Sequence, residues 1–380
     1  MSALKKIIKQ KIDDSENGNI SFRDYMNMVL YYPNLGYYAS SKEKVSEFGD
    51  FITATSQTSI FASTFAGQFA PVLKSLGHDV CMVEFGAGTG KFAVDCMAEL
   101  ERLGQLPNKY IIIELSNDLK LRQQENIQKN LPHLFDRFEW LVELPSQKIK
   151  AVVFANEVLD AMAVDIFKAK DNVLIQQGVQ TVADEFELVG LRENDKRFDI
   201  ESQHIMSDIE SFEDGYTSEL NTWIRPWAKS IADTLEQGMV FLCDYGYDRK
   251  TYYMSERSMG TLACYHQHKV NYDPFINIGE QDVTAHVDFT AVAEAFTGCG
   301  FELDGYMTQA NFLKNANVAE VFLQISQRLN ETDRVKYSKD LKELLLGDKL
   351  AETFKVFCCS KDFDEVLGVF DNEDNIDYVL

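Results

Sequence analysis

The sequence predicts an α/β protein built on a doubly wound, mostly parallel β-sheet. Three observations carry this prediction. Apolar, β-branched runs alternate with amphipathic helical patterns through the centre of the chain, a glycine-dense turn follows the first run, and acidic residues follow several others. Such alternation is typical of parallel sheets covered by helices on both faces. Ligands of these sheets bind at the carboxyl ends of the strands, so the glycines and acids indicate a site there.

Residues 1–76 predict a helical segment ahead of the sheet that encloses an aromatic loop. Phe22 and Met26 recur at helical spacing, and Pro33 ends that run. A turn dense in tyrosine follows, and a second helix is expected over residues 59–76. The N-terminal segment is therefore expected to add helices to the sheet.

The central elements share strand-like or helix-like hydrophobic patterns. The strands are expected at 80–85, 110–114, 138–142, 151–155 and 239–244. The helices are expected at 91–103, 119–130 and 223–235. The closing strands are expected at 301–307 and 354–359. Together they form a core over residues 77–361.

Two insertions interrupt this core, at about 166–235 and 248–298. The first begins with alternating apolar and polar residues, which predict an inserted hairpin rather than more parallel sheet. The second is rich in Gly, Tyr and His. Residues 362–380 are acidic and are expected to form a loosely held tail.

The charge of the chain narrows the classes of partner. With 37 Lys and Arg against 60 Asp and Glu, the formal net charge is -23. Such a surface repels nucleic acids and anionic membranes and favours basic partners. The 7 cysteines are scattered, which indicates reduced thiols, and no apolar run approaches the ~20 residues of a membrane span. We expect a soluble cytoplasmic protein without membrane insertion.

The glycine-dense turn predicts a nucleoside pocket. Gly86, Gly88 and Gly90 follow an apolar run that ends in Glu84 and Phe85. Glycines let the backbone approach a ligand closely, and the amide groups at the start of the following helix are free to bind it.

Spacing discriminates between the cofactors that use such a turn. A Walker loop needs a glycine five residues before Gly90 and a hydroxyl after Lys91, where this chain has Phe85 and Phe92. A dinucleotide fingerprint needs a third glycine where Lys91 stands, which argues against a nicotinamide without eliminating it.

The spacing Glu84-x-Gly86-x-Gly88-x-Gly90 instead resembles motif I of S-adenosylmethionine-dependent methyltransferases. Such a cofactor has no pyrophosphate, and its ammonium group is matched by an acid such as Glu84. Glu114 ends the next strand, where a carboxylate can accept both ribose hydroxyls. NAD enzymes share that requirement, and the alternative for Glu114 is an acid at a helix N-terminus.

A second set of acids follows the fourth strand. Asn156, Glu157 and Asp160 lie at the carboxyl edge of the sheet, and 244–246 closes the fifth strand at the same edge. If a helix begins here, the two carboxylates share a face and can bind the nitrogens of a guanidinium. The alternative for one of these acids is helix capping.

Two further clusters offer weaker candidates. His286 and Asp288 lie on one side of an extended segment, where the acid either holds the histidine as a general base or serves a structural hydrogen bond. Cys264, His266 and His268 alternate, but their spacing fits no zinc signature, so no metal is expected.

The assembled motifs resemble the MidA-type methyltransferases, whose mitochondrial members are arginine methyltransferases that assist respiratory complex I assembly. The likeness runs from about Ile20 to Lys361. It rests on the ordered segments 31–38, 49–54, 84–90, 114–116, 155–161, 244–246, 260–262 and 279–289. The chain departs from the family pattern at 55–59, where Ser56 replaces an acid, and at Met162, where a proline is common.

The resemblance implies a class I Rossmann-like methyltransferase fold with helical N-terminal and inserted segments, and S-adenosylmethionine as cofactor. The residues assigned to the cofactor are Gly36, Tyr38, Thr53, Glu84, Gly86, Gly88, Gly90, Glu114, Leu115 and Asn156. Glu157 and Asp160 would orient a guanidinium, and His286 is a candidate for accepting the released proton.

We interpret the chain as a protein arginine methyltransferase. Its partner would be a protein with an accessible arginine, such as a respiratory complex I-type subunit, and a homodimer is compatible with the sequence. In a eukaryote the mitochondrial matrix would replace the cytoplasm. Two alternatives remain open, a nicotinamide-dependent oxidoreductase and a non-catalytic assembly factor that binds S-adenosylmethionine.

Overall fold

The computed structural model describes residues 2–40, 58–347, 351–365, 367–371 and 375–380. The segment 49–54, including Thr53, lies outside these residues. No helix in the described ranges combines the length and apolar character that crossing a membrane requires.

A mixed sheet in the order β15-β16-β10-β5-β2-β3-β4 forms the centre of the fold. Its strands are β2 (Val80–Phe85), β3 (Lys109–Ile113), β4 (Phe138–Leu141), β5 (Ile149–Asn156), β10 (Leu235–Tyr247), β15 (Glu302–Thr308) and β16 (Phe354–Lys361). The first five run parallel to one another, whereas β16 runs antiparallel between β10 and β15. The mostly parallel sheet is confirmed.

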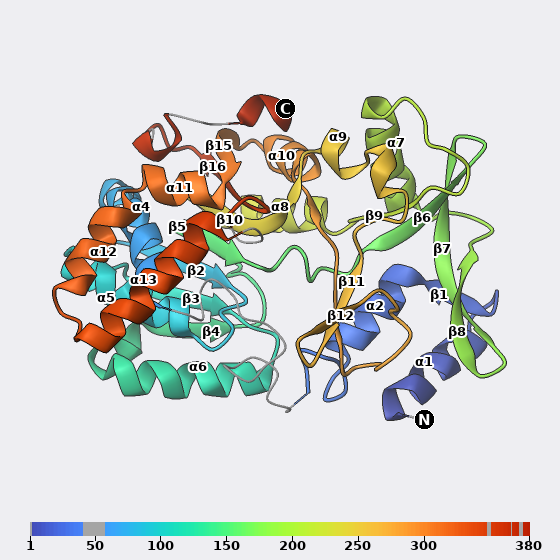
Figure 1. Cartoon of the computed structure of the whole chain (residues 1–380), viewed down its shortest axis with the longest axis horizontal. Coiled ribbons are helices and arrows are strands. Elements are labelled where there is room, and N and C mark those ends of the chain that lie inside the picture. The colour runs from blue at the N-terminus through green and yellow to red at the C-terminus, as the bar shows by residue number, and fades with distance from the viewer. Residues whose placement is uncertain (1, 41–57, 348–350, 366, 372–374) are drawn as a thin grey trace.

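Helices pack on both faces of this sheet (Figure 1). One face carries α4 (Ile60–Leu76), α5 (Lys91–Arg102), α6 (Asn117–Asn130), α11 (Gln309–Asn315), α12 (Val318–Ser326) and α13 (Glu331–Leu346). The other carries α8 (Ile224–Thr234) and α10 (Phe289–Thr297). Successive residues of a strand point to opposite faces of the sheet. Met82 therefore packs in the core on the first face and Val83 in the core on the second. The doubly wound arrangement is confirmed.

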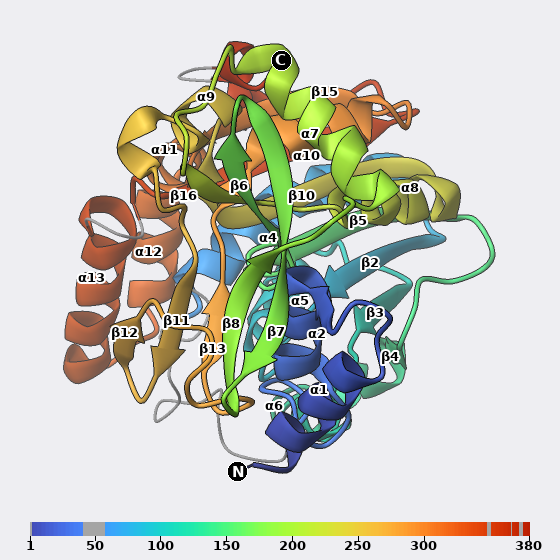
Figure 2. The same ribbon diagram turned by 90° about the vertical axis from the view of Figure 1, so that its right-hand side faces the viewer.

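A second, antiparallel sheet lies beside this core and contains the N-terminal segment. It has the order β1-β7-β6-β9, with β8 paired to β7. Its strands are β1 (Asn19–Ser21), β6 (Asp165–Lys170), β7 (Val173–Val182), β8 (Glu185–Gly190) and β9 (Thr217–Leu220). Figure 2 shows α1 (Ala3–Asp13), α2 (Phe22–Tyr31) and α7 (Lys196–Asp208) around these strands. The inserted hairpin is confirmed, and it extends to the three-stranded meander β6–β8.

The second insertion contributes a small third sheet, with the order β12-β11-β13. Its strands are β11 (Ala263–His266), β12 (Lys269–Asn271) and β13 (Asp282–Thr284). The short helix α9 (Arg249–Tyr252) precedes it, and β14 (Val287–Asp288) follows and pairs with the end of β10. This sheet lies against the N-terminal helices and thereby reaches the carboxyl edge of the central sheet.

The structure differs from the sequence expectations at the C-terminus. Phe363, Val369 and Phe370 are buried in the core that covers one face of the sheet, and Val379 is buried in the other. The expectation of a loosely held tail is therefore wrong for the described part of this segment. Its acidic residues obscured a set of apolar side chains that anchor it.

Candidate active site

The glycine turn lies between the end of β2 and the start of α5. Gly86, Gly88 and Gly90 have φ values of 62°, 52° and 76°, in the left-handed region that favours glycine. A Cβ on Gly86 would lie 3.1 Å from the Val158 side chain, and one on Gly90 would lie 3.2 Å from Cα of Gln123. Glycine is thus required here both by the backbone conformation and by close packing.

Glu114 connects this turn to helix α6. Its Oε1 accepts a hydrogen bond from the Ser116 amide at 2.8 Å, and its Oε2 accepts one from Gln123 Nε2 at 2.9 Å. The same Nε2 donates to the Gly88 carbonyl at 3.0 Å. Burial raises the pKa of the carboxyl group. Because a carboxylate offers about four acceptor positions, Glu114 retains capacity for ribose hydroxyls.

Two other residues assigned to the cofactor lie in contrasting environments. Leu115 is 69% exposed at the edge of the sheet, although it is apolar. Glu84 is buried, its Oε2 accepts a hydrogen bond from the Tyr110 hydroxyl at 2.7 Å, and burial raises its pKa to about 8. Glu84 therefore lies beneath the glycine turn, and its contact with an ammonium group stays a prediction.

The acids after β5 occupy a turn, and no helix begins there. Oδ2 of Asp244, at the end of β10, accepts the backbone amides of Val158, Leu159 and Asp160 at 2.9–3.2 Å. Glu157 has a φ of 53°, an uncommon conformation for a residue other than glycine. The helix-capping alternative for these acids is excluded, because Asp244 fixes the turn instead.

Asp160 is prepared to bind a cationic or hydrogen-bonding group. Its side chain is buried, and Oδ2 accepts a short hydrogen bond from the Tyr245 hydroxyl. Its Oδ1 is buried and has no hydrogen-bond partner among the described residues. Burial raises the pKa of Asp160 to about 6. An unsatisfied buried oxygen is costly, so this atom indicates where a ligand binds.

Glu157 lies next to Asp160 and shares its electrostatic environment. Its Oε1 accepts a hydrogen bond from Asn156 Nδ2 at 3.0 Å, and Oδ1 of Asn156 is buried without a partner in the described ranges. Burial, and then the charge of Asp160, raise the pKa of Glu157 to about 8. Asp282 on β13 adds to this repulsion.

The N-terminal loop closes over these acids. The Tyr38 hydroxyl donates to Asp282 Oδ2 at 2.8 Å, and its ring stacks on Tyr31 with a centroid distance of 5.5 Å. The Tyr31 hydroxyl donates to the Ala161 carbonyl. A Cβ on Gly36 would lie 2.6 Å from the Leu30 carbonyl oxygen, so this loop requires glycine. The structure thus brings Tyr38 to the acids and gives Gly36 a structural role in the loop.

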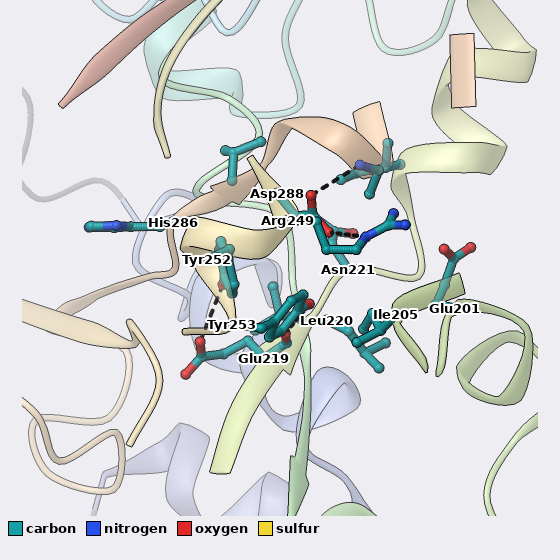
Figure 3. A pocket seen from close by; sticks show the side chains of 14 residues that line it. Glu201, Ile205, Glu219, Leu220, Asn221, Arg249, Tyr252, Tyr253, His286 and Asp288 are labelled. Carbon is teal, nitrogen blue, oxygen red and sulfur yellow. Dashed lines mark hydrogen bonds and ion pairs between the residues drawn. The ribbon is translucent and has the colours of Figure 1, made fainter. Parts of the chain in front are cut away.

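The expected pairing of His286 with Asp288 is wrong. Nδ1 of His286 is buried and has no partner among the described residues, whereas Asp288 accepts a hydrogen bond from Arg249 Nε at 3.1 Å (Figure 3). The imidazole packs against Tyr245 with a centroid distance of 5.1 Å. Burial, and then the charge of Arg257, lower the pKa of His286 to about 4. His286 is therefore a weak base beside the acids.

The cavity behind His286 is a structural feature rather than a ligand pocket. Its volume of about 20 Å³ holds little more than a water molecule. Arg249 lines it and forms ion pairs with Asp208, Asp288 and Glu294, which join α7 and α10 to α9. Figure 3 shows Arg249 and its partner Asp288 among the side chains that line this cavity.

The sequence did not indicate Gln123 or Asp282 as site residues. It placed Asp244 and Tyr245 at the site but gave no sign that Asp244 accepts backbone amides or that Tyr245 donates to Asp160. Asp282 belongs to the segment 279–289, on which the family resemblance rests, and this resemblance could have indicated Asp282 as a site residue. The contacts of Gln123 with Gly88 and of Tyr245 with Asp160 depend on the fold, so no local pattern predicts them.

These features define a Rossmann-like nucleotide-binding protein, with a glycine turn after a central strand and acids at the carboxyl edge. A family model described as "Putative S-adenosyl-L-methionine-dependent methyltransferase" matches residues 64–307. The chain belongs to this family of methyltransferases.

Two crystal structures from Burkholderia thailandensis are similar to the whole chain. Both are 33% identical to it, and each alignment covers 98% of this chain and 95% of the other. The first, with a TM-score of 0.90, is described as "a COG1565 superfamily member and likely methyl transferase" bound to S-adenosyl-homocysteine. The second, an uncharacterized protein of the same superfamily, has a TM-score of 0.87. No curated protein matches the chain.

The family assignment decides between the cofactors that the glycine turn left open, in favour of S-adenosylmethionine over a nicotinamide. The described residues fit this cofactor. The left-handed backbone of the glycine turn favours residues without side chains, which lets a ligand approach the backbone, and Glu114 and the exposed Leu115 offer polar and apolar contacts beside it.

Proposed function

We propose that the chain is a protein arginine N-methyltransferase of the MidA type. The observation that carries this proposal is the pair Glu157 and Asp160, half-buried and buried at the carboxyl edge beside the glycine turn. Burial is the largest cause of the raised pKa of both groups, and the other contributing groups among the described residues are acids and hydrogen-bond donors rather than cations. Because buried carboxylates without a counter-ion are costly, a cationic acceptor is the ligand that would stabilise them.

The two acids would share the work of orientation and proton acceptance. S-adenosylmethionine, when bound, supplies an electrophilic methyl group. Oδ1 of Asp160 would accept a hydrogen bond from one guanidinium nitrogen and hold it in line with that methyl. Methylation of an already charged guanidinium by a sulfonium releases one proton. Glu157 in its carboxylate form would accept it, so with a pKa of about 8 its contribution should grow as the pH rises toward 8, and His286 is a much weaker base.

The acceptor would be an arginine on another protein. Support comes from the net charge of -23, which favours basic partners, and from the resemblance to MidA-type methyltransferases, whose mitochondrial members assist respiratory complex I assembly. We therefore propose a complex I-type subunit as partner, in the cytoplasm or, in a eukaryote, in the mitochondrial matrix.

The test is transfer of a radioactive methyl group from labelled S-adenosylmethionine to the protein fraction of a cell lysate, followed by mass spectrometry of the product. The variant Glu157→Gln is expected to lower the transfer rate about 100-fold, because it removes the proton acceptor. Its affinity for S-adenosylhomocysteine, measured by calorimetry, should stay within about threefold of the unsubstituted protein.

The matched control is Glu236→Gln, which makes the same change at an exposed position near the start of β10. It is expected to transfer methyl groups at the unsubstituted rate. A Glu157→Gln protein with full activity would overturn the role of Glu157, and label on a residue other than arginine would overturn the acceptor.

A further inference from the structure

We propose that one face of the sheet β12-β11-β13 docks the segment of the acceptor protein that carries the target arginine. This face is defined by Asp282, Tyr265 and Val270, together with Tyr272 at its rim. The inference rests on the proposed arginine methyltransferase function and adds to it a place and a chemistry for recognition of the protein substrate.

The strand register places these side chains in one row. Tyr265 on β11 is the partner of Asp282 on β13 and of Val270 on β12. Directly opposed residues in a sheet project from the same face. The neighbouring pair, Cys264 and Val283, is buried in the N-terminal apolar cluster, so it defines the opposite face. The row of Tyr265 therefore faces away from that cluster.

The inner end of this row belongs to the acid site. Asp282 accepts the Tyr38 hydroxyl, and its charge raises the pKa of Glu157. Two residues further along β13, on the same face, the Thr284 side chain contacts the Tyr245 hydroxyl, which in turn donates to Asp160. The face is thus continuous with the carboxylates that would bind a guanidinium.

Exposure increases from the acids outward. Asp282 is 4% exposed, Tyr265 is intermediate, Val270 is 51% exposed and Tyr272 is 75% exposed. Burial raises the pKa of Tyr265, and the nearby groups that add to this rise are Tyr272 on one side and the two aspartates on the other. Tyr265 therefore bridges the buried acids and the apolar rim.

This gradient matches the side chain of arginine, which has a charged head on an apolar stem. The guanidinium would reach the acids, the stem would pack along Tyr265, and the residue next to the arginine would contact the rim. Val270 and Asp282 are two strand spacings apart, about 10 Å, which a long side chain and its neighbour can span. The ligand is thus a segment with an apolar residue beside a surface-exposed arginine, attracted by the negative charge of the chain.

The test removes the apolar rim without changing the acids. The double variant Val270→Ser/Tyr272→Ser is compared with Val173→Ser/Tyr378→Ser. The control pair removes the same side chains at similar exposure, 58% and 69%, in β7 and near the C-terminus. Methyl transfer to lysate protein is measured at limiting protein concentration, and affinity for S-adenosylhomocysteine is measured by calorimetry.

The rim variant is expected to lose about tenfold in transfer rate, while the control pair and both cofactor affinities stay within about twofold. Equal rates for the rim variant and the control pair overturn the docking face but leave the methyltransferase proposal standing. Label on a residue other than arginine, or no label with the unsubstituted protein, overturns the proposed function and the docking face with it.

Discussion

The proposed donor side and the proposed acceptor side of the site are built in different ways. The donor side consists of the glycine turn with Glu114 and Gln123, which come from neighbouring strand–helix units of the central sheet. The acceptor side consists of Asp160 and Glu157 with Asp244, Tyr38 and Asp282. Its residues come from two sheet strands, the N-terminal loop and the second insertion.

This difference separates what the Rossmann-like core does from what its additions do. These donor-side residues all lie within the core, where the backbone conformation of the turn and two side chains shape the pocket. The acceptor side forms only when Tyr38 and Asp282 are brought over the acid turn by segments outside that core. We infer that the additions serve to select the methyl acceptor.

The largest effect is expected on the acceptor side, from Asp244→Asn. Oδ2 of Asp244 accepts three backbone amides and Oδ1 accepts the Tyr245 amide, so an asparagine would direct its NH2 group at other donors. The expected loss is about 3 kcal/mol of unfolding free energy, since several buried hydrogen bonds are broken and backbone donors lose their acceptor. Methyl transfer should fall below detection. Urea unfolding and the labelling assay measure the two effects.

Asp248→Asn is the matched control for that variant. Asp248 also follows β10 and accepts a backbone amide, that of Thr251, as the N-cap of α9. Because asparagine caps helices about as well as aspartate, the expected change is below about 0.5 kcal/mol. If Asp244→Asn proves equally mild, the acid turn is held by other contacts and the comparison of the two sides loses its basis.

The two sides also differ in how far the sequence predicts them. The glycine turn is a local pattern, because left-handed backbone and close packing require glycine at fixed positions. The strands and helices of the central sheet are predictable for a similar reason, because each leaves a local hydrophobic pattern in the sequence. On the acceptor side the sequence indicated Glu157 and Asp160 from their place after a strand, but the contacts that orient them join residues far apart in the chain.

His286 and Asp288 show why alternation alone misleads. Their spacing predicts a shared side, but Asp288 is the N-cap of α10 and is held by Arg249 from another element. The C-terminal segment was misjudged for a related reason. Its burial depends on apolar side chains that the core provides, and no periodic pattern within the segment indicates it.

A smaller effect is expected on the donor side, from Gly90→Ala. Its φ of 76° disfavours any side chain, and the added Cβ would lie within 3.4 Å of three Gln123 atoms. The expected loss is about 2 kcal/mol, with weaker binding of S-adenosylhomocysteine, because the turn and α6 must separate.

Gly104→Ala isolates the contribution of packing to that loss. Gly104 has a φ of 70°, but a Cβ there would meet no atom within 4 Å. It should cost about 1 kcal/mol and leave the affinity for the cofactor product unchanged. Calorimetry and urea unfolding of both variants make the comparison. Equal losses of unfolding free energy in the two variants would show that the Gln123 side chain moves aside at little cost. Glycine would then be required at position 90 only for its backbone conformation.

The smallest effect is expected from Tyr245→Phe, which removes only the hydroxyl that donates to Asp160. This hydrogen bond lowers the pKa of Asp160 against the larger effect of burial, which raises it to about 6. Without the hydroxyl the pKa should rise further, and less ionised Asp160 would remain near pH 6. The acid limb of the rate profile should therefore move to higher pH, with a loss of about tenfold at pH 6 and about twofold at pH 8.5.

Tyr247→Phe is the control, because Tyr247 contacts His286 rather than Asp160. Its rate profile should coincide with that of the unsubstituted protein. A loss for Tyr245→Phe that is equal at all pH values would mean that the hydroxyl only supports packing. A shifted acid limb would instead show that methyl transfer requires ionised Asp160. It would also show that the hydrogen bond from Tyr245, near the end of β10, lowers the pKa of Asp160.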